Sequence, residues 1–245
     1  MCNMSGKAFQ HVLDNAPRGQ PLDPGMLREL GVSPALASYW VRAGWLLRLS
    51  KGAYLTRGDK PTSDGIFVYL SRRVQGLHVG GKTALDWQGV RHNVAFRPRT
   101  VLWGQTPYRF PVWVSEHVLY SYQTTQLFHD GFSYMAGLKA LPNGNPEVLV
   151  SAPERALLEL ASDVGKRHSL DEAINIAQTL RNLRVHVLDQ FLEACLRVKV
   201  VRLVRDIGLA TGFEWGSNLQ KHVDRLGGKR WSNQIRTGER LVLKP

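Results

Sequence analysis

The chain has 245 residues, with 32 Lys and Arg against 20 Asp and Glu, and its formal net charge is +12. Hydrophobic residues make up 43% of it, which is enough to build a core and excludes a disordered tail. The positive charge favours a polyanionic partner or an acidic protein surface.

Two cysteines, Cys2 and Cys195, provide neither a disulfide framework nor a metal-ligand set. The histidines lack ligand spacing, so we expect no metal and no cofactor. No apolar run approaches about 20 residues and no signal-peptide pattern is present, which predicts a cytosolic protein without a membrane segment. The absence of paired carboxylates and of a nucleophile–base set indicates that the protein is not an enzyme.

The beginning of the chain is predicted to be helical over residues 5–16, which have an apolar side suited to pack on the next elements. Two short helices are then expected. Asp23 and Ser33 are natural N-caps, and each is followed by a proline at the first helical position. Gly31 and Gly44 supply the left-handed residues that end these helices.

Two β-prone runs, 45–49 and 53–55, follow the second short helix and are joined by a turn that contains Gly52. Helix, tight turn, helix and hairpin in about three dozen residues is the layout of a winged helix-turn-helix, which places its second helix in the DNA major groove. The alternative is a winged helix used only to dock another protein.

The outward face of the second short helix follows from its period, which turns Leu36, Trp40 and Ala43 inward. Small, hydroxyl and basic side chains then face outward, where they can meet base edges and phosphates. Two basic residues on the hairpin are placed to meet the DNA backbone or minor groove. The predicted contacts are Ala35, Ser38, Tyr39 and Arg42 on the helix and Arg48 and Lys51 on the hairpin.

A polar, breaker-rich segment at 58–64 is the best linker in the chain, so we place a domain boundary there. A helix over 63–74 opens the second domain. Gly76–Thr83 then matches the G-x-x-x-x-G-K-S/T phosphate-loop pattern, but a polar basic segment precedes it where a buried strand is needed. We interpret the match as accidental, with a turn at Gly80 and Gly81 and Thr83 as the cap of a short helix over 84–89.

Several β-rich runs follow, and they predict a small, mostly antiparallel sheet. The first two of them are predicted to form a hairpin. Aromatic residues in these runs are interpreted as sheet core. The predicted strands are residues 100–103, 109–114, 120–128, 132–137 and 147–150.

The chain is predicted to be helical from Ser151, with capping boxes at Ser151/Glu154 and Ser169/Glu172 and four apolar stripes at helical spacing. A helix over 198–209 turns basic residues outward, which gives a second basic surface; the alternative is a solvated helix face with Arg202 paired to Asp206. A helix over 217–224 and a strand over 240–243 complete the chain. This second surface consists of Arg197, Lys199, Arg202 and Arg205.

The predicted fold class is α+β, with an N-terminal winged helix-turn-helix over 1–59 and a larger C-terminal domain over 60–245. Within that domain we expect a sheet-rich part, a helical half and a terminal strand. These parts correspond to residues 60–150, 151–226 and 240–243.

Five sequence blocks, spread over nearly the whole chain, resemble the AbiEi family in their order. The members of this family are antitoxins of type IV toxin–antitoxin systems. The blocks read LGVSPALASYWVRAGWLLRLSKGAYL, HVGGKTALDWQGV, VLVSAPERALLELASDV, VKVVRLVRDIGLATGFEWGSNL and RLGGKRW.

The resemblance implies a winged helix that binds inverted repeats of double-stranded DNA in its own promoter and represses its operon. Because one recognition helix makes few phosphate contacts and two copies double them, we expect a homodimer on DNA. The resemblance also implies a C-terminal domain that counteracts a nucleotidyltransferase toxin without a stable complex. It adds Ser33 to the positions that match the DNA-reading helix and wing, and the family often has a basic residue where Ser38 stands. The rival interpretation is a stand-alone transcriptional regulator whose C-terminal domain senses a ligand or partner.

Overall fold

The computed structural model describes residues 2–90, 98–141, 143–181, 183–234, 238 and 240–245. The chain forms two compact units, and each unit is built from two stretches of sequence. The first unit combines Met1–Gln75 with Thr106–Leu119, and the second combines Gly76–Gln105 with Tyr120–Pro245. No helix among the described residues is both long and apolar enough to cross a membrane.

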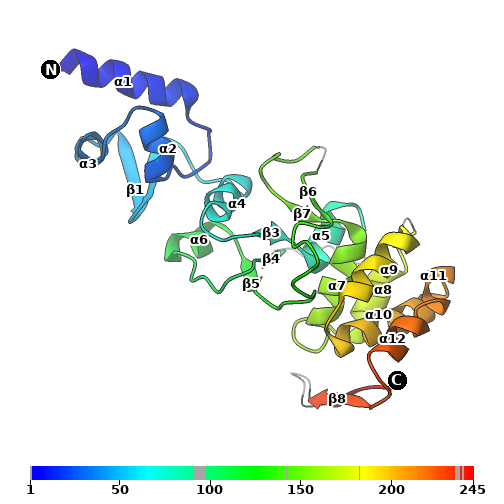
Figure 1. The fold of residues 1–245 in the computed structure, drawn as a ribbon. Coiled ribbons are helices and arrows are strands. Elements are labelled where there is room, and N and C mark those ends of the chain that lie inside the picture. Colours follow the sequence, from blue (N-terminus) through cyan, green and yellow to red (C-terminus); the bar gives the residue numbers. More distant parts are fainter. Residues whose placement is uncertain (1, 91–97, 142, 182, 235–237, 239) are drawn as a thin grey trace. The chain divides into compact units, whose positions relative to one another are not determined.

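The first unit contains the predicted helix–turn–helix–hairpin order, with three further helices among its described residues (Figure 1). Gly31 and Gly44 adopt positive φ angles of 76° and 72°, as expected of residues that end helices. The elements are α1 (Cys2–Asn15), α2 (Pro24–Glu29), α3 (Pro34–Arg42), β1 (Leu46–Ser50), β2 (Ala53–Thr56), α4 (Ser63–Ser71) and α6 (Val112–His117).

Both predicted N-caps are confirmed. The Asp23 carboxylate accepts hydrogen bonds from the backbone N–H groups of Gly25, at 2.6 Å, and Met26, at 3.0 Å. The Ser33 hydroxyl accepts one from the N–H of Leu36 at 3.2 Å. These contacts satisfy donors that the first turn of a helix leaves without partners, so they fix where α2 and α3 begin.

Replacing Asp23 with Ala is expected to lower the free energy of unfolding of the first unit by about 1 kcal/mol, because two helical N–H groups lose their acceptor. Urea denaturation followed by circular dichroism measures this. Asp23→Asn is the control, since an amide oxygen still caps the helix. An equal loss in both variants would assign the effect to the ion pair between Asp23 and Arg73, whose charged atoms lie 3.8 Å apart.

The core of the first unit is centred on Trp40, which is fully buried. Phe9 of α1 meets the Trp40 ring edge-on at 5.2 Å, and the Trp45 ring lies 5.0 Å from Phe9. The predicted inward position of Ala43 is wrong, because α3 ends at Arg42 and Ala43 is an exposed C-cap residue. Ala37, three residues before Trp40, is the buried alanine of this helix.

The β1–β2 turn is held by side chains that lie beyond residue 59, in α4, directly after it and in α6. Its Gly52 carbonyl accepts hydrogen bonds from Arg73 Nη2 at 2.9 Å and from the Tyr69 hydroxyl at 3.2 Å. The Trp113 indole N–H donates to the Ser50 hydroxyl at 3.1 Å. The first compact unit therefore extends past the predicted linker and includes α4 and α6.

The predicted strand at 109–114 is wrong, because this stretch leads into α6, whose N-cap is Pro111. Trp113 and Val114 are buried on the helix, and the Trp113 ring packs edge-on against Tyr69 at 5.5 Å. The apolar run at Val112–Val114 fits a strand or a buried helix segment equally well, since periodicity alone cannot separate the two in so short a stretch.

The second unit contains a five-stranded sheet of order β5–β4–β3–β7–β6. Mostly antiparallel pairing was expected, but this sheet is mixed: β4–β5 and β3–β7 are parallel, whereas β3–β4 and β6–β7 are antiparallel. The predicted hairpin of 100–103 with 109–114 does not form, since β4 pairs with β3 and β5. The strands are β3 (His78–Val79), β4 (Thr100–Trp103), β5 (Tyr120–Gln123), β6 (Leu138–Lys139) and β7 (Val150–Ser151).

The predicted strand at 132–137 is also wrong. The carbonyl groups of Tyr134 and Ala136 accept hydrogen bonds from the guanidinium of Arg155, so a buried side chain takes the place of a neighbouring strand. The predicted strand at 120–128 stops at Gln123.

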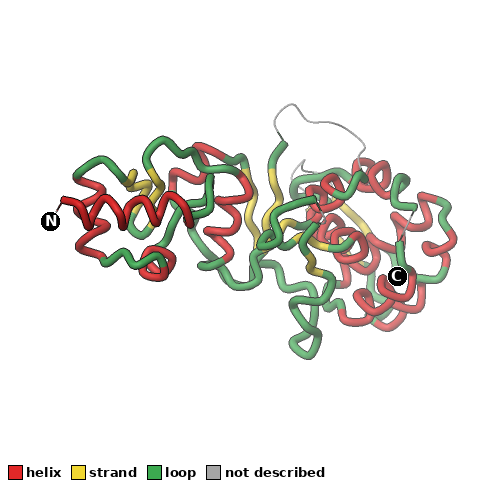
Figure 2. Tube along the Cα trace, turned by 90° about the horizontal axis from the view of Figure 1, so that it is seen from above, coloured by secondary structure: helices red, strands yellow, loops and turns green. Residues whose placement is uncertain are grey.

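Helices form the rest of the second unit, gathered around α7, whose residues from Glu154 to Asp163 are all buried (Figures 1 and 2). A terminal hairpin of β8 and β9 follows, and its last strand agrees with the predicted 240–243. The predicted class, α+β with a winged helix and a larger C-terminal part, is confirmed. The elements are α5 (Gly81–Trp87), α7 (Pro153–Asp163), α8 (Leu170–Ala177), α9 (Val185–Ala194), α10 (Val198–Thr211), α11 (Glu214–Ser217), α12 (Gln220–Arg225), β8 (Trp231–Gln234) and β9 (Arg240–Leu243).

Candidate nucleic-acid interface and buried charge network

All seven residues predicted to contact DNA are exposed. They lie on α3 and on the β1–β2 hairpin, which we call the wing. The helix contributes Ser33, Ala35, Ser38, Tyr39 and Arg42, and the wing contributes Arg48 and Lys51.

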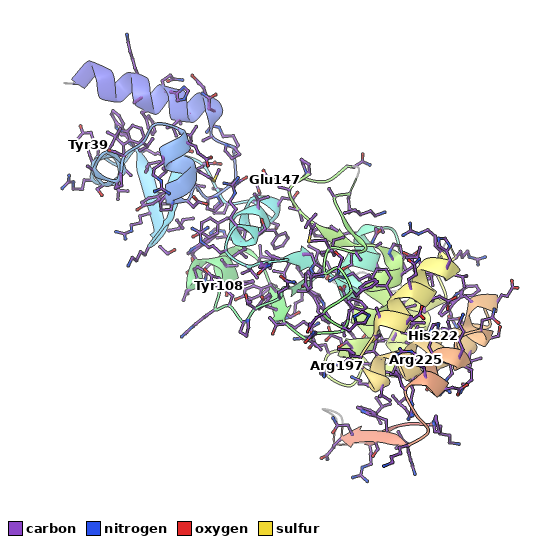
Figure 3. The ribbon with its side chains drawn as sticks, viewed as in Figure 1. Tyr39, Tyr108, Glu147, Arg197, His222 and Arg225 are labelled. Carbon is purple, nitrogen blue, oxygen red and sulfur yellow. The ribbon has the colours of Figure 1, made fainter. Side chains whose placement is uncertain are left out.

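Tyr39 lies on the outer side of α3 with 45% of its surface exposed (Figure 3). One edge of its ring packs against Trp45, with the ring centres 6.4 Å apart. Trp45 in turn contacts the buried Trp40 ring at 6.3 Å. The outward face of α3 is thus anchored to the core of the first unit. Because these side chains are already ordered, DNA binding has a smaller entropic cost.

No carboxylate in the described part of the chain neutralises the positive charge of this face. Among the described residues, Arg42, Arg48 and Lys51 form no ion pair, and each is exposed. Ser33 uses its hydroxyl oxygen to accept the cap hydrogen bond, so the hydroxyl proton remains able to donate to a phosphate. Cations and a helix N-terminus on one face are the groups that contact a DNA backbone.

Leu47 is an apolar member of the wing that the predicted contact set does not include. Its neighbour Leu46 is buried, and strand alternation turns Leu47 outward, where it is 55% exposed. The adjacent leucines gave a visible signal in the sequence, but only the strand register decides which of them faces outward.

The predicted second basic surface does not exist as one exposed patch. Arg202 and Arg205 are only 1% and 7% exposed. Arg202 donates hydrogen bonds to the carbonyl groups of Leu243 and Gly227, at 3.1 and 2.8 Å. The C-terminal strand therefore covers the face of α10 that helical spacing had assigned to solvent.

Asp206 also differs from the prediction, since it binds the neighbouring Arg205, with Nε and Oδ1 2.8 Å apart, and not Arg202. Arg205 further donates to the Gln220 side chain and to the Lys244 carbonyl, at 2.7 and 3.0 Å. Buried guanidinium groups are stable only with such partners. Arg197 is exposed and Lys199 is partly exposed.

The Gly76–Thr83 segment uses its phosphate-loop groups for internal contacts. The backbone N–H of Gly81 donates to the Glu159 carboxylate at 2.8 Å, and the Lys82 ammonium pairs with Glu172 at 2.6 Å. The Thr83 hydroxyl accepts from the N–H of Val101 at 2.9 Å. The predicted cap at Thr83 is wrong, because α5 begins at Gly81 and Thr83 lies inside it.

Glu159 is the centre of a buried charge network that sequence reasoning missed. Its carboxylate accepts hydrogen bonds from Arg155 Nε, the Ser151 hydroxyl and the Gly81 N–H, each at 2.8 Å. His78 Nε2 lies 3.0 Å away. Burial by itself raises the pKa of Glu159, but His78 and Arg155 outweigh it and bring that pKa to about 2. Glu159 is therefore ionised at neutral pH and ties β3, α5 and β7 to α7.

The predicted capping box at Ser151 and Glu154 is wrong because both side chains have other partners. Ser151 belongs to β7, and its hydroxyl donates a hydrogen bond to Glu159. The helix α7 starts after Ala152 without a side-chain cap. Glu154 instead pairs with Arg184 at 2.9 Å. At Ser169 the predicted cap is confirmed, since its hydroxyl accepts from the N–H of Glu172.

Within the described parts of the chain, no three His, Cys, Asp or Glu side chains gather as a metal site. The buried network is saturated by its own hydrogen bonds, so it stabilises the fold. The exposed face of α3 and the wing is the candidate interface.

Comparisons with known proteins cover almost the whole chain. Residues 6–96 match a family model described as the N-terminal domain of the AbiEi antitoxin transcriptional regulator, and residues 97–242 match one described as the AbiEi antitoxin transcriptional regulator of type IV toxin–antitoxin systems. No curated protein sequence matches the chain.

Among solved structures, the crystal structure of the Rv2827c protein from Mycobacterium tuberculosis is similar, with a TM-score of 0.59 and 15% identity. The match covers 92% of this chain and 82% of that one, which indicates a shared fold. The chain belongs to the AbiEi family of antitoxin transcriptional regulators of type IV toxin–antitoxin systems.

Proposed function

We propose that this protein represses its own toxin–antitoxin operon by binding inverted repeats in the promoter through α3 and the wing. We further propose that residues 1–59 supply the DNA contact and that residues 60–245 counteract a nucleotidyltransferase toxin. The observation that carries the first proposal is the exposed face of Arg42, Arg48 and Lys51, which has no carboxylate partner among the described residues and stands on a rigid aromatic core.

A pair of protein copies suits an inverted repeat for a physical reason. One recognition helix makes few phosphate contacts, whereas two copies on adjacent half-sites double them. If each copy neutralises about four phosphates, the logarithm of affinity should fall with the logarithm of salt concentration with a slope on the order of −7. We therefore expect a homodimer on DNA. The toxin-directed proposal rests on membership of the antitoxin family.

The testing experiment is fluorescence anisotropy with the promoter duplex upstream of the gene, titrated across a salt series beside a scrambled duplex of equal length. Repression through inverted repeats requires preferential binding of the promoter duplex with a steep salt slope. Equal, weak binding of both duplexes would reject it and leave the first unit as a protein-docking module.

The Arg42→Ala substitution is expected to weaken binding of the promoter duplex by about 1–3 kcal/mol, because Arg42 lies exposed on the recognition helix. Anisotropy at fixed salt measures the change. Arg181→Ala is the matched control, as it removes an exposed arginine from the second unit. If both variants bind like the original protein, Arg42 has no reading role.

A growth assay tests the rival interpretation of a stand-alone regulator. The product of the neighbouring gene is expressed with and without this chain, and this chain should restore growth only if that product is a toxin that it counteracts. Repression without any such rescue would favour a regulator whose second unit senses a ligand or partner.

A further inference from the structure

Two pockets adjoin each other in the second unit, and they share Thr124, Thr125 and Gln126 as a common wall. The first, here called the aromatic pocket, has a volume of about 460 Å³. The second, the basic pocket, has a volume of about 780 Å³. Both volumes are in or near the range of small-molecule sites, which is about 300–1,000 Å³.

The aromatic pocket is lined by the rings of Trp103, Phe128, Phe132 and Tyr134. Of its two carboxylates, Glu159 is paired with Arg155, whereas Asp130 accepts from the neutral Gln126 amide at 2.7 Å and keeps its negative charge. Asp130 is exposed, so its charge lies at the solvent side of the pocket, and the buried part of the lining is mainly aromatic. Such a lining favours an uncharged planar ring.

Trp103 indicates that a ligand of this pocket would carry a hydrogen-bond acceptor. It is 2% exposed, and its buried indole N–H has no hydrogen-bond partner among the residues that the structure describes. A buried donor without an acceptor is unfavourable, because it has lost its hydrogen bonds to water and gained none in the protein. A ligand acceptor that reaches this N–H through a small side-chain rotation would remove that penalty. Heteroaromatic rings combine a planar face with such an acceptor.

The basic pocket has the opposite character. Lys166, Arg197 and Lys199 line it, and no Asp or Glu is among its described lining residues. Arg197 uses Nε for the Gln126 carbonyl at 2.7 Å, which leaves its terminal nitrogens for a ligand. The Lys199 ammonium donates to the carbonyls of Ser162 and Val164, at 3.0 and 2.6 Å, and retains a third hydrogen.

Burial, together with the nearby charge of Lys166, lowers the pKa of Lys199 to about 8. The site therefore holds like charges close together, and the nearby carboxylate of Asp163 offsets them only in part. A phosphate group bound there would offset this repulsion and accept hydrogen bonds from both Arg197 and Lys199. The wall between the pockets adds the hydroxyls of Thr124 and Thr125, which suit a sugar.

From this geometry we propose that the second unit binds a nucleotide, with the base in the aromatic pocket, the phosphate in the basic pocket and the sugar along Thr124 and Thr125. No residue of the Gly76–Thr83 segment lines either pocket, and the polar groups described above for that segment are already bound to protein. It lies in the other unit from α3 and the wing, so the inference goes beyond the proposed repressor function and does not depend on it.

Isothermal titration of the full chain with AMP, GMP, CMP and UMP tests the proposal, with the four nucleosides and inorganic phosphate as separate ligands. We expect at least one nucleotide to bind tenfold or more tighter than both its nucleoside and phosphate. Phosphate binding as strong as every nucleotide would overturn the proposal in favour of a simple anion site. The proposal would also be overturned if no nucleotide showed saturable binding, or if a bound nucleotide could be displaced only by an oligonucleotide and not by another nucleotide.

The double variant K166A/R197A is expected to weaken nucleotide binding by about tenfold or more while leaving nucleoside binding unchanged, because only phosphate contacts are removed. K229A/R230A is the matched control, since both residues are exposed in the same unit and lie outside both pockets.

Trp103→Phe preserves a ring but removes the N–H, so it should weaken nucleoside and nucleotide binding by the same factor. Unchanged affinity in both K166A/R197A and Trp103→Phe, with unaltered circular dichroism, would reject the assigned site.

Discussion

Replacing Glu159 with Ala is expected to lower the free energy of unfolding of the second unit by about 3–5 kcal/mol. The substitution leaves Arg155 and His78 buried beside each other without their anion, and it frees the donors of Ser151 and Gly81. Uncompensated buried charge of this kind is among the most destabilising changes in a protein. Differential scanning calorimetry and guanidinium denaturation measure the loss.

The same residue predicts a pH dependence of stability. The pKa of Glu159 is lowered from 4.5 to about 2 in the folded chain, so its ionised form stabilises the fold fully above pH 4.5. That stabilisation is lost as the pH falls through 4.5 towards 2. The Glu159→Ala variant should lack this component of the acid titration.

Glu193→Ala is the control, because Glu193 is exposed on α9 of the same unit. It should change stability by no more than about 0.5 kcal/mol. Glu159→Gln tests the charge separately from the shape. If Glu159→Gln is as stable as the original protein, the negative charge is not the cause, because the amide retains the shape and an oxygen that accepts hydrogen bonds.

Replacing Trp40 with Ala is expected to destabilise the first unit by about 3–5 kcal/mol, the usual loss for a large buried aromatic side chain. The Trp40 side chain is fully buried, and Phe9 and Trp45 pack against its ring. Loss of that ring removes the side chain through which α3 packs on the core of the first unit. Promoter binding should therefore fall in parallel with the fraction of folded protein.

Tyr39→Ala separates the two effects, because Tyr39 neighbours Trp40 in sequence but is 45% exposed. It should weaken DNA binding while changing the stability of the first unit by less than about 1 kcal/mol. Urea denaturation and anisotropy on both variants test this. Similar stability losses in the two variants would show that Tyr39 belongs to the core and not to the interface.

The sequence by itself determined the elements whose signals are local. Asp23 and Ser33 each bond a backbone N–H two or three residues away, so the starts of α2 and α3 could be read from a few neighbouring residues. Gly31 and Gly44 end these helices through their own backbone freedom. The exposed positions of α3, from Ala35 to Arg42, followed from helical period once Trp40 was assigned inward.

Only the tertiary structure decided the features that join distant segments. Arg202 has the sequence spacing of an exposed residue, but the terminal strand 41 residues away covers it. Val112–Val114 forms a helix because Trp113 meets Tyr69 and Ser50. Glu159 combines groups from four elements, two of them about 80 residues away in sequence. Hydrophobic period and capping patterns report a residue's neighbours along the chain, whereas burial and charge pairing depend on what the fold brings beside it.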